Sequence, residues 1–588
     1  MLPSSDIYKE NLALYPLQAV GIYKLQPAES YFTLIVNDKY LHSRYAPLQE
    51  AERKARELIG KENDLIILAG CGLGYLAEIL LKKGFRNLLW FESDDEILFH
   101  AFHLFNFSHF IKDGRLRLIN QYKDDFVENE LKKFAPDHIH IIPFRPSNVI
   151  SSSYQSFTDF VFQTLQRKNV NQATLIKFQK SWANNIITSY PLLQSVRPVS
   201  HLFSKFQNAP CVICGAGPSL AESMSELRQV KDKVFIICVD TALHVLLSHS
   251  IEPDIVVSVD PQPLNRSFLE VKTRSVIYVV DPATSYLSLR LLPPENIYVF
   301  DSPFPSAKFL FSFYEHNPGK IAYGGSVSTN AYDLACQMGF QPIYFAGQDL
   351  SFARGEVHAR GAMLEERLNL KECKTFRREM HNYKQLHALP VKYLFGLSGK
   401  QVPTNDKMLI FHQWFCDRFK IDSAKGLDIR NATAYGAHLP YLKTGRLLDF
   451  IDLPELNKAI QRESYNFDKK NFIAGLNQLI IDFHSTYSIA SQALQLVKKN
   501  IGKKDLSPEF LQQLDLFDEE IRSKNLVLDF CCMAMQKVIF DLMEDSNNMH
   551  PLTQSENFYE ELRASLLWHI KKLEKAMQVL CKENSPLS

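Results

Sequence analysis

The sequence predicts an α/β protein, with two Rossmann-like parallel-sheet domains followed by a helical C-terminal domain. Three observations support this prediction. Apolar runs of strand length alternate with helical segments over much of the first 450 residues. Two of these runs end in glycine-rich turns, at residues 70–74 and 215–217. Beyond about residue 450 glycine becomes rare, and apolar residues recur with helical spacing.

The length and composition are those of a multidomain globular protein. The chain has 588 residues, more than one domain of about 100–200 residues accommodates. Its 66 basic and 65 acidic residues nearly balance, whereas nucleic-acid binders normally carry a basic surplus. Residues 1–15 lack the apolar core of a signal peptide, and no apolar run reaches the roughly 18 residues of a membrane helix. We therefore expect a cytoplasmic protein without a membrane span that does not bind nucleic acid.

Changes in periodicity divide the chain into four segments. Residues 1–150 are expected to form an N-terminal Rossmann-like domain. One apolar strand, at residues 65–68, precedes its glycine-rich turn, and the next, at residues 88–91, follows a helical segment. Residues 151–208 show helical periodicity and few glycines, which predicts a helical bridge. Residues 209–450 form the central domain, and residues 451–588 form the helical C-terminal domain. The apolar stripes of this last segment suit packing in a bundle or formation of a homo-oligomer.

The central domain has the clearest strand pattern. Six apolar runs separated by helical stretches predict a parallel sheet, at residues 211–214, 234–239, 255–259, 276–280, 297–300 and 342–346. A small or polar residue follows each run: Gly215, Asp240, Asp260, Asp281, Asp301 and Gly347. Because ligands of open parallel sheets bind at the carboxyl ends of the strands, this rim is the predicted binding site.

The turn after the first of these strands has the features of an anion site. Gly215 and Gly217 let the backbone approach a ligand closely. Pro218 suits the first helical position, and Ser219 with Glu222 fits a capping box. The free N–H groups expected at the helix start attract anions. Tight strand–helix turns also use this glycine spacing without a ligand, so the turn by itself is weak evidence.

A second glycine-rich turn precedes another helix of the same domain. The sequence Gly324-Gly325-Ser326-Val327 is followed by apolar residues with i, i+3, i+4, i+7 spacing. Two such helix starts on one sheet favour a ligand with several polar groups, such as a nucleotide that carries a sugar.

Two residues that could act as a base follow the last predicted strand. Gly347-Gln348-Asp349 ends that strand, and His358 lies in the polar loop beyond it. A hydroxyl group is deprotonated by a base whose pKa is near neutrality, which histidine or a buried aspartate provides. The residues leave two interpretations open: catalytic bases, or a loop-capping aspartate and one exposed histidine among 18.

Taken in this order, the motifs resemble those of the bacterial motility-associated factor family. The resemblance extends from about residue 175 to residue 445. The family comprises flagellin glycosyltransferases whose central domain is similar to bacterial sialyltransferases. The segments that carry the resemblance are 212–220, 240–242, 251–254, 259–260, 324–327 and 347–350, with Trp182, Asn184 and Asn185 upstream and 431–433 and 436–437 downstream.

The resemblance implies transfer of a nonulosonic acid, pseudaminic or legionaminic acid, from its CMP-activated form to serine or threonine of flagellin. It implies no metal and no cofactor beyond this donor, and a role in flagellum assembly and motility. Asp349 or His358 would act as the base or position the donor. The implied nucleotide-sugar-binding residues are Gly215, Ala216, Gly217, Pro218, Ser219, Asp240, Thr241, Asp260, Gly324, Gly325, Ser326, Val327 and Gln348. Because Ala216 replaces an amide side chain of the sialyltransferases, recognition at this point would depend on the backbone.

Three other functions remain open. The central domain also resembles a hydroxymethylpterin pyrophosphokinase, which would use ATP and magnesium held by Asp240, Asp260 and Asp349. The turn at residues 70–74 with Glu92 resembles an S-adenosylmethionine-dependent methyltransferase, although a structural Rossmann-like unit is the favoured interpretation. The third alternative is a non-catalytic flagellin-binding protein whose helical C-terminus binds a partner helix.

Overall fold

The computed structural model describes residues 10–582 apart from residues 12, 15–16, 18–20, 30, 145, 148–149, 376, 461, 464, 504–505 and 545–549, and apart from the side chains at 166, 169, 171, 368, 369, 378, 543 and 544. The chain forms two compact units, the first ending at Ala173 and the second beginning at Thr174. Among these described residues, no helix combines the length and apolar character needed to cross a bilayer.

The first unit is built on a four-stranded parallel sheet with the order β6-β5-β4-β7. Its strands are β4 (Leu65–Ala69), β5 (Asn87–Phe91), β6 (Leu116–Ile119) and β7 (Ile139–Pro143). Its shorter helices are α2 (Pro47–Arg56), α3 (Tyr75–Lys82), α4 (Asp95–Leu104), α5 (Ser108–Lys112) and α6 (Asp124–Lys132). A small antiparallel sheet joins β1 (Lys24–Pro27), β2 (Phe32–Val36) and β3 (Lys39–Tyr40). The predicted Rossmann-like organisation of this part is confirmed.

One long helix occupies most of the predicted helical bridge. Helix α7 (Ser153–Leu193) has 41 residues. In the first unit its Tyr154 and Phe157 are buried against the sheet, and in the second unit its Ile186 and Tyr190 enter the core. The prediction was wrong for residues 197–198, which form strand β8 (Arg197–Pro198) at the edge of the central sheet. A strand of two residues is too short to show a period in sequence.

The second unit contains a nine-stranded sheet with the order β18-β17-β14-β9-β10-β11-β12-β13-β8. Every neighbouring pair in it is parallel. All six predicted strands are confirmed, as β9 (Cys211–Cys214), β10 (Phe235–Val239), β11 (Ile255–Ser258), β12 (Ile277–Val280), β13 (Ile297–Val299) and β14 (Ile343–Ala346). The sheet is completed on the β14 side by β17 (Ile429–Asn431) and β18 (Lys443–Thr444).

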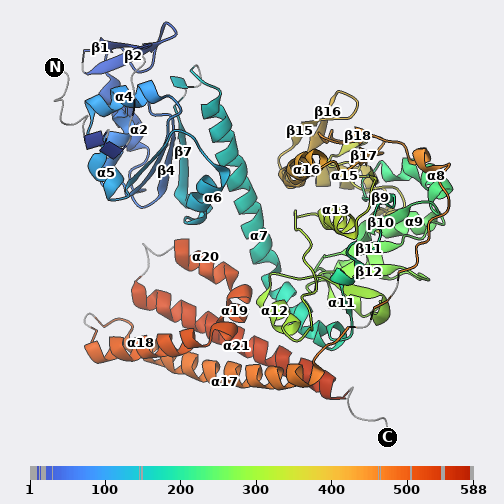
Figure 1. Ribbon diagram of the computed structural model, residues 1–588. Helices are drawn as coiled ribbons and strands as arrows, with labels where there is room; N and C mark the ends of the chain where they lie inside the picture. The colour runs from blue at the N-terminus through green and yellow to red at the C-terminus, as the bar shows by residue number, and fades with distance from the viewer. Residues whose placement is uncertain are drawn as a thin grey trace. The chain divides into compact units, whose positions relative to one another are not determined.

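Helices cover both faces of this sheet, as Figure 1 shows for α8 and α9 on one side and α13 on the other. Alternate strand residues enter different cores, because successive side chains of a strand point to opposite faces. Cys214 packs in the core that contains α8 (Leu220–Val230) and α9 (Leu243–Ser248). Ile213 packs in the core that contains α13 (Val327–Met338) and α16 (Asp406–Ala424).

The remaining elements are α10 (Arg266–Leu269), α11 (Tyr286–Leu289), α12 (Pro305–Phe311), α14 (Met363–Asn369), α15 (Arg378–Leu386) and the hairpin of β15 (Lys392–Phe395) and β16 (Gln401–Thr404).

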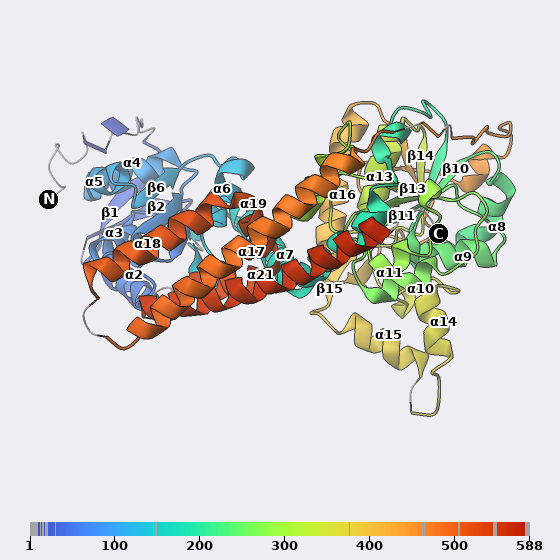
Figure 2. The same cartoon turned by 90° about the horizontal axis from the view of Figure 1, so that it is seen from below.

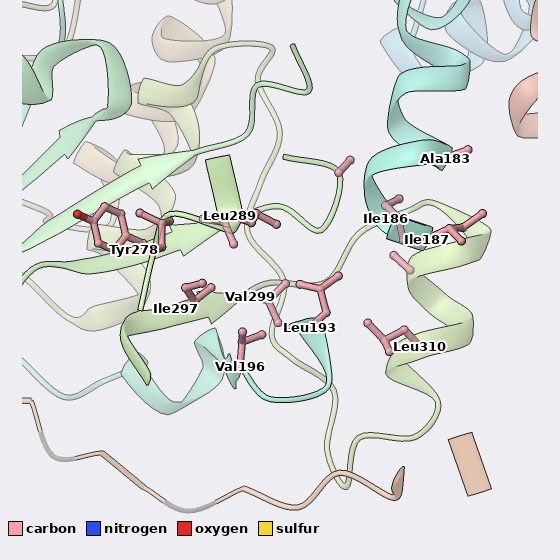
Figure 3. Close-up of a cluster of buried hydrophobic side chains, with 14 of the residues drawn as sticks. Ala183, Ile186, Ile187, Leu193, Val196, Tyr278, Leu289, Ile297, Val299 and Leu310 are labelled. Atoms are coloured by element: carbon pink, nitrogen blue, oxygen red, sulfur yellow. The ribbon is translucent and has the colours of Figure 1, made fainter. Parts of the chain in front are cut away.

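The helical C-terminal segment is confirmed and belongs to the second unit. Its long helices α17 (Lys469–Asn500) and α21 (Pro551–Lys582) run side by side (Figure 2). The shorter helices are α18 (Pro508–Ser523), α19 (Asn525–Ala534) and α20 (Gln536–Glu544). Figure 3 shows part of the core beside the sheet, where Ile186 of α7, Leu310 of α12 and Val299 of β13 gather.

Candidate functional site

The order of the central strands indicates that a ligand of this sheet would bind beside β9. From β9 the chain adds β10 to β13 on one side, and then returns to add β14 on the other. Open parallel sheets bind ligands outside the carboxyl ends of the strands at the point where this order reverses. In this sheet the point lies between β9 and β14, which are followed by the turns at residues 215–219 and 347–349.

The two turns are packed against each other through their glycines. The Gly215 N–H donates to the Ala346 carbonyl at 2.8 Å, and the Gly217 N–H donates to the Gly347 carbonyl at 2.9 Å. A Cβ atom at Gly215 would lie 2.5 Å from the Gly347 oxygen, and one at Gly217 would lie 2.6 Å from Asp349 Cγ. These contacts require glycine at both positions. Packing therefore explains the two glycines, which the sequence alone suggested were needed for close approach of a ligand.

Asp349 fastens the second turn to the start of α8. Its carboxylate accepts hydrogen bonds from the Ser219 N–H, at 2.8 Å, and from the Ser219 hydroxyl. Its side chain is 2% exposed, and burial raises the pKa of the carboxyl group to about 7. Asp349 therefore lies beneath the turn as an internal acceptor, a geometry that suits positioning of the turn better than contact with an acceptor hydroxyl.

The predicted capping box at the start of α8 is wrong. The Ser219 side chain makes no capping hydrogen bond to the helix, because its hydroxyl binds Asp349. The Glu222 side chain pairs with Arg354 at 2.5 Å instead of returning to Ser219. Helix α8 begins at Leu220, so Pro218 lies in the turn and not at the first helical position.

Four N–H groups at this helix start, which we expected to be free, are already paired within the protein. The N–H groups of Gly217 and Ser219 donate to Gly347 and Asp349. The Leu220 N–H donates to the Gly217 carbonyl at 3.0 Å, and the Glu222 N–H donates to the Ser219 carbonyl at 3.1 Å. These four donors are satisfied within the protein, so they do not form an open phosphate cradle of the kind a P-loop offers.

His358 lies against the same turn from the following loop. The adjacent Ala359 N–H donates to the Ala216 carbonyl at 3.0 Å, which joins the loop to the turn. His358 is half-buried. Burial and the nearby His381 lower the pKa of its imidazole to about 4, whereas a hydrogen bond to the backbone of Ala216 acts in the opposite direction. The imidazole is therefore neutral at pH 7, and one nitrogen of a neutral imidazole ring can accept a proton.

The aspartates on the β10 and β11 side have different degrees of access. Asp240 is 2% exposed and accepts hydrogen bonds from the Thr241 N–H at 2.7 Å, the Ser258 hydroxyl at 2.6 Å and the Asn265 amide at 2.7 Å. Burial raises the pKa of its carboxyl group to about 6. The half-buried Asp260 accepts from the Gln262 N–H at 2.9 Å. Ser258 and Asn265 were not predicted, because no local pattern links them to Asp240.

The second glycine-rich turn lies at the same edge of the sheet, because α13 precedes the parallel strand β14 and runs opposite to it. The Gly324 N–H donates to the Thr329 hydroxyl at 3.0 Å. A Cβ atom at Gly324 would lie 2.6 Å from the ring of Trp414 in α16. Gly325 is exposed at a φ of +86°, and Ser326 and Val327 are half-buried. This turn thus presents partly accessible groups while its glycine packs on α16.

The segment after β17 contacts the turn at residues 347–349. The Gln348 N–H donates to the Thr433 hydroxyl at 3.2 Å, and the Ala437 N–H donates to the Asp349 carbonyl at 2.8 Å. Asp240, Asp260 and Asp349, which would hold magnesium in the pyrophosphokinase alternative, do not form a cluster of three ligands. In the described parts of the chain, no three histidine, cysteine or acidic side chains are grouped so that they could hold a metal ion.

Side chains of the protein occupy the space beside the glycine-rich turn of the first unit. A Cβ atom at Gly70 would lie 2.4 Å from the Ser147 hydroxyl, and one at Gly72 would lie 2.3 Å from His42 Nε2. The Leu73 N–H donates to this His42 nitrogen at 2.9 Å. Glu92 is fully buried and accepts hydrogen bonds from the Tyr154 hydroxyl and, at 3.3 Å, the Cys71 N–H. These residues do not fit the S-adenosylmethionine site of the methyltransferase alternative.

Glu92 makes the stability of the first unit depend on pH. Burial raises the pKa of its carboxyl group from 4.5 to about 7. Between these values the folded state keeps a proton that the unfolded chain has released, so stability falls as pH rises and levels off above pH 7. We expect Glu92→Gln to remove about 3 kcal/mol of this fall.

The measurement is a series of thermal unfolding curves from pH 4.5 to 7.5 for wild type, Glu92→Gln and the exposed control Glu57→Gln. The Cys71 hydrogen bond is weakened in Glu92→Gln at every pH, so the difference in pH slope is the informative quantity. Equal slopes for Glu92→Gln and wild type would contradict a buried, protonated Glu92.

Comparisons with known proteins agree with this architecture. The family model for MptE-like 6-hydroxymethylpterin diphosphokinase matches residues 184–355. An uncharacterized protein of Treponema pallidum (strain Nichols) is 26% identical over 386 residues, which are 62% of this chain and 64% of the relative. A second uncharacterized protein of that organism is 28% identical over 161 residues, which are 25% of this chain and 40% of the relative. The chain therefore spans less than two thirds of the length of these curated relatives.

Among solved structures, the MAf glycosyltransferase from Magnetospirillum magneticum AMB-1 superimposes with a TM-score of 0.53 and 14% sequence identity. The match covers 99% of this chain and 97% of that chain. The chain shares the fold of this glycosyltransferase. The resemblance predicted from the central motifs is thereby confirmed for the fold, and it extends to both flanking segments.

Proposed function

We propose that the protein is a glycosyltransferase that moves pseudaminic or legionaminic acid from its CMP-activated form to serine or threonine of flagellin. The reaction would take place in the cytoplasm and serve flagellum assembly and motility. The observation that carries the proposal is the fold shared with the MAf glycosyltransferase over 99% of the chain. The point between β9 and β14 where the strand order reverses supports it, because two turns of the implied donor site, at residues 215–219 and 347–349, meet there.

The accessible groups at this edge of the sheet suit a sugar nucleotide bound mainly by polar and backbone contacts. Ala216, Thr241, Asp260 and Ser326 are all half-buried. In the proposal they contact the donor, and the buried Ser219, Asp240, Gln348 and Asp349 hold the turns in place. The CMP phosphate is a good leaving group, so positioning and charge stabilisation supply much of the catalysis.

The two candidate bases are assigned different tasks in this proposal. Asp349 is buried and both of its oxygens accept hydrogen bonds from Ser219, which suits a positioning residue. His358 is half-buried beside Ala216 and suits contact with the acceptor hydroxyl. A base with a pKa near 4 is weak, so its contribution would consist largely of orienting the hydroxyl.

The direct test is an incubation of the protein with flagellin and either CMP-pseudaminic or CMP-legionaminic acid. We expect the intact mass of flagellin to rise by one or more nonulosonic acid residues with one of the donors. Reactions without donor or with free CMP serve as controls. An unchanged flagellin mass with both donors would contradict the transferase proposal and favour a non-catalytic flagellin-binding protein.

A second candidate function is supported by one specific observation, the match of residues 184–355 to the MptE-like family model. A 6-hydroxymethylpterin diphosphokinase would transfer a diphosphate from ATP to the pterin alcohol and release AMP. Incubation with 6-hydroxymethylpterin, ATP and magnesium tests it, and AMP production that requires the pterin would favour it over glycosyl transfer.

A further inference from the structure

The first unit contains a cavity of about 510 Å³ that none of the functions discussed above uses. It lies beyond the carboxyl ends of β5 and β6, where Ser93 and Asp94 follow one strand and Asn120 and Gln121 follow the other. It is distinct from the turn at residues 70–74, which follows β4 and is filled by His42 and Ser147. The position is one where parallel sheets bind ligands.

Aromatic rings form part of the cavity wall and are held in place by the core. Phe91, Tyr122 and Tyr23 line the cavity. Phe91 stacks on Phe157 of α7 with ring centroids 4.4 Å apart, and Tyr122 contacts the same ring at 5.1 Å. The Tyr23 hydroxyl donates to Asp94 Oδ2 at 2.6 Å. These contacts give the cavity preformed apolar surfaces, as in most small-molecule sites.

Polar side chains complete the wall, and hydrogen bonds to one another or to neighbouring residues orient several of them. They are Ser93, Asp94, Asn120, Gln121, Ser151 and Ser153. The Ser153 hydroxyl donates to Ser93 at 2.8 Å, and the Asn120 amide donates to Asp95 at 3.3 Å. Asp94 also accepts hydrogen bonds from two N–H groups at the start of α4. The wall thus combines hydroxyl, amide and carboxylate groups around aromatic rings.

The charge of the wall limits the ligand. Among the residues that the structure describes, this wall includes one carboxylate, that of Asp94, and no lysine, arginine or histidine. A phosphate or a carboxylate would enter without a cationic partner and beside a negative charge, which is unfavourable in a partly buried site. An uncharged ring with several hydroxyl groups meets neither penalty, because it can pack on aromatic faces and exchange hydrogen bonds with amides and hydroxyls.

We propose that this cavity binds an uncharged sugar ring, such as a neutral hexose or an N-acetylhexosamine. Asn120 and Gln121 hydrogen-bond the ring hydroxyls, and Tyr122 provides both an apolar surface and a hydroxyl. The proposal does not depend on the transferase function, since the cavity lies wholly within the first unit and the candidate transferase site lies within the second.

The test uses the full chain and methyl glycosides of neutral hexoses and N-acetylhexosamines as probes. Saturation-transfer NMR detects binding, and calorimetry measures the affinity. We expect at least one glycoside to bind, and Asn120→Ala and Tyr122→Phe each to weaken it roughly tenfold through loss of a hydrogen bond. Phe126→Ala, an exposed aromatic on α6 outside the cavity wall, is the matched control and retains wild-type affinity. Thermal unfolding of each variant checks its fold, and Tyr122→Phe keeps the ring that packs on Phe157.

Several results would overturn the proposal. Absence of binding by all the neutral glycosides would do so, and so would undiminished binding by folded Asn120→Ala and Tyr122→Phe. Adenosine and CMP are included as competing probes. Binding of adenosine that Asn120→Ala weakens, without binding of any glycoside, would assign the cavity to a nucleoside. Binding of CMP that Asn120→Ala weakens would contradict the exclusion of anions, whereas CMP bound in the second unit is unaffected by this change. Failure of flagellin modification would leave the sugar-binding result unaffected.

Discussion

Asp349→Asn and Ser219→Ala are expected to lower transferase activity to a similar extent. Each change removes part of the same contact, in which the Asp349 carboxylate accepts hydrogen bonds from the Ser219 N–H and hydroxyl. The contact is buried, so loss of one partner leaves a polar group unsatisfied at a cost of about 1–3 kcal/mol. The start of α8 would then shift relative to β14, and donor binding would weaken with it. The measurement is initial rates of flagellin modification at varied CMP-sugar concentration.

The two roles proposed for Asp349 predict different patterns in these rates. A positioning residue raises KM for the donor in both variants, because the turn proposed to bind the donor is displaced in both. A general base lowers kcat by roughly 10²–10⁴ in Asp349→Asn only, because Ser219 takes no part in the proton transfer from the acceptor hydroxyl. Asp452→Asn, at an exposed position of the same unit, controls for the change in charge. A large kcat defect confined to Asp349→Asn would contradict the positioning role.

The strands of the central sheet could be predicted because each is buried on both faces. Residues of β9 and β12 are almost completely inaccessible, and such strands are continuous apolar runs in sequence. The edge strands β8 and β18 have two residues each and carry no comparable pattern. The hairpin of β15 and β16 was missed as well, since its exposed residues do not alternate between buried and exposed faces.

The position of the candidate site could be predicted from sequence, whereas its internal contacts could not. Glycine turns and strand-end aspartates mark the rim of the sheet through local composition. The partner of Ser219 is Asp349, 130 residues away, and the partners of Asp240 include Asn265, 25 residues away. Such pairs are set by strand order, which no local pattern reports. The same limit explains why the turn at residues 70–74 resembled a cofactor site although His42 fills it.

The largest loss of stability is expected for Gly347→Ala, and Gly355→Ala provides a matched comparison. Both glycines have positive φ, at +70° and +73°. A Cβ atom at Gly347 would lie 2.6 Å from the Gly215 oxygen and 2.7 Å from Leu220 Cβ, whereas one at Gly355 would meet nothing within 4 Å. Gly355→Ala should therefore cost about 1–2 kcal/mol for the left-handed backbone. Gly347→Ala should cost roughly 3–5 kcal/mol, because overpacking is added to that strain.

Unfolding temperatures of the two variants, compared with wild type, separate backbone strain from packing. Strain affects both variants equally, so the additional loss in Gly347→Ala measures how tightly the turns after β9 and β14 press on each other. Equal losses would mean that these turns can move apart at little cost. In that case the glycines at residues 215 and 217 would no longer be explained by packing, and close approach of the donor would become their better explanation. The comparison therefore decides whether packing against the turn after β14 or close approach of a ligand explains Gly215 and Gly217.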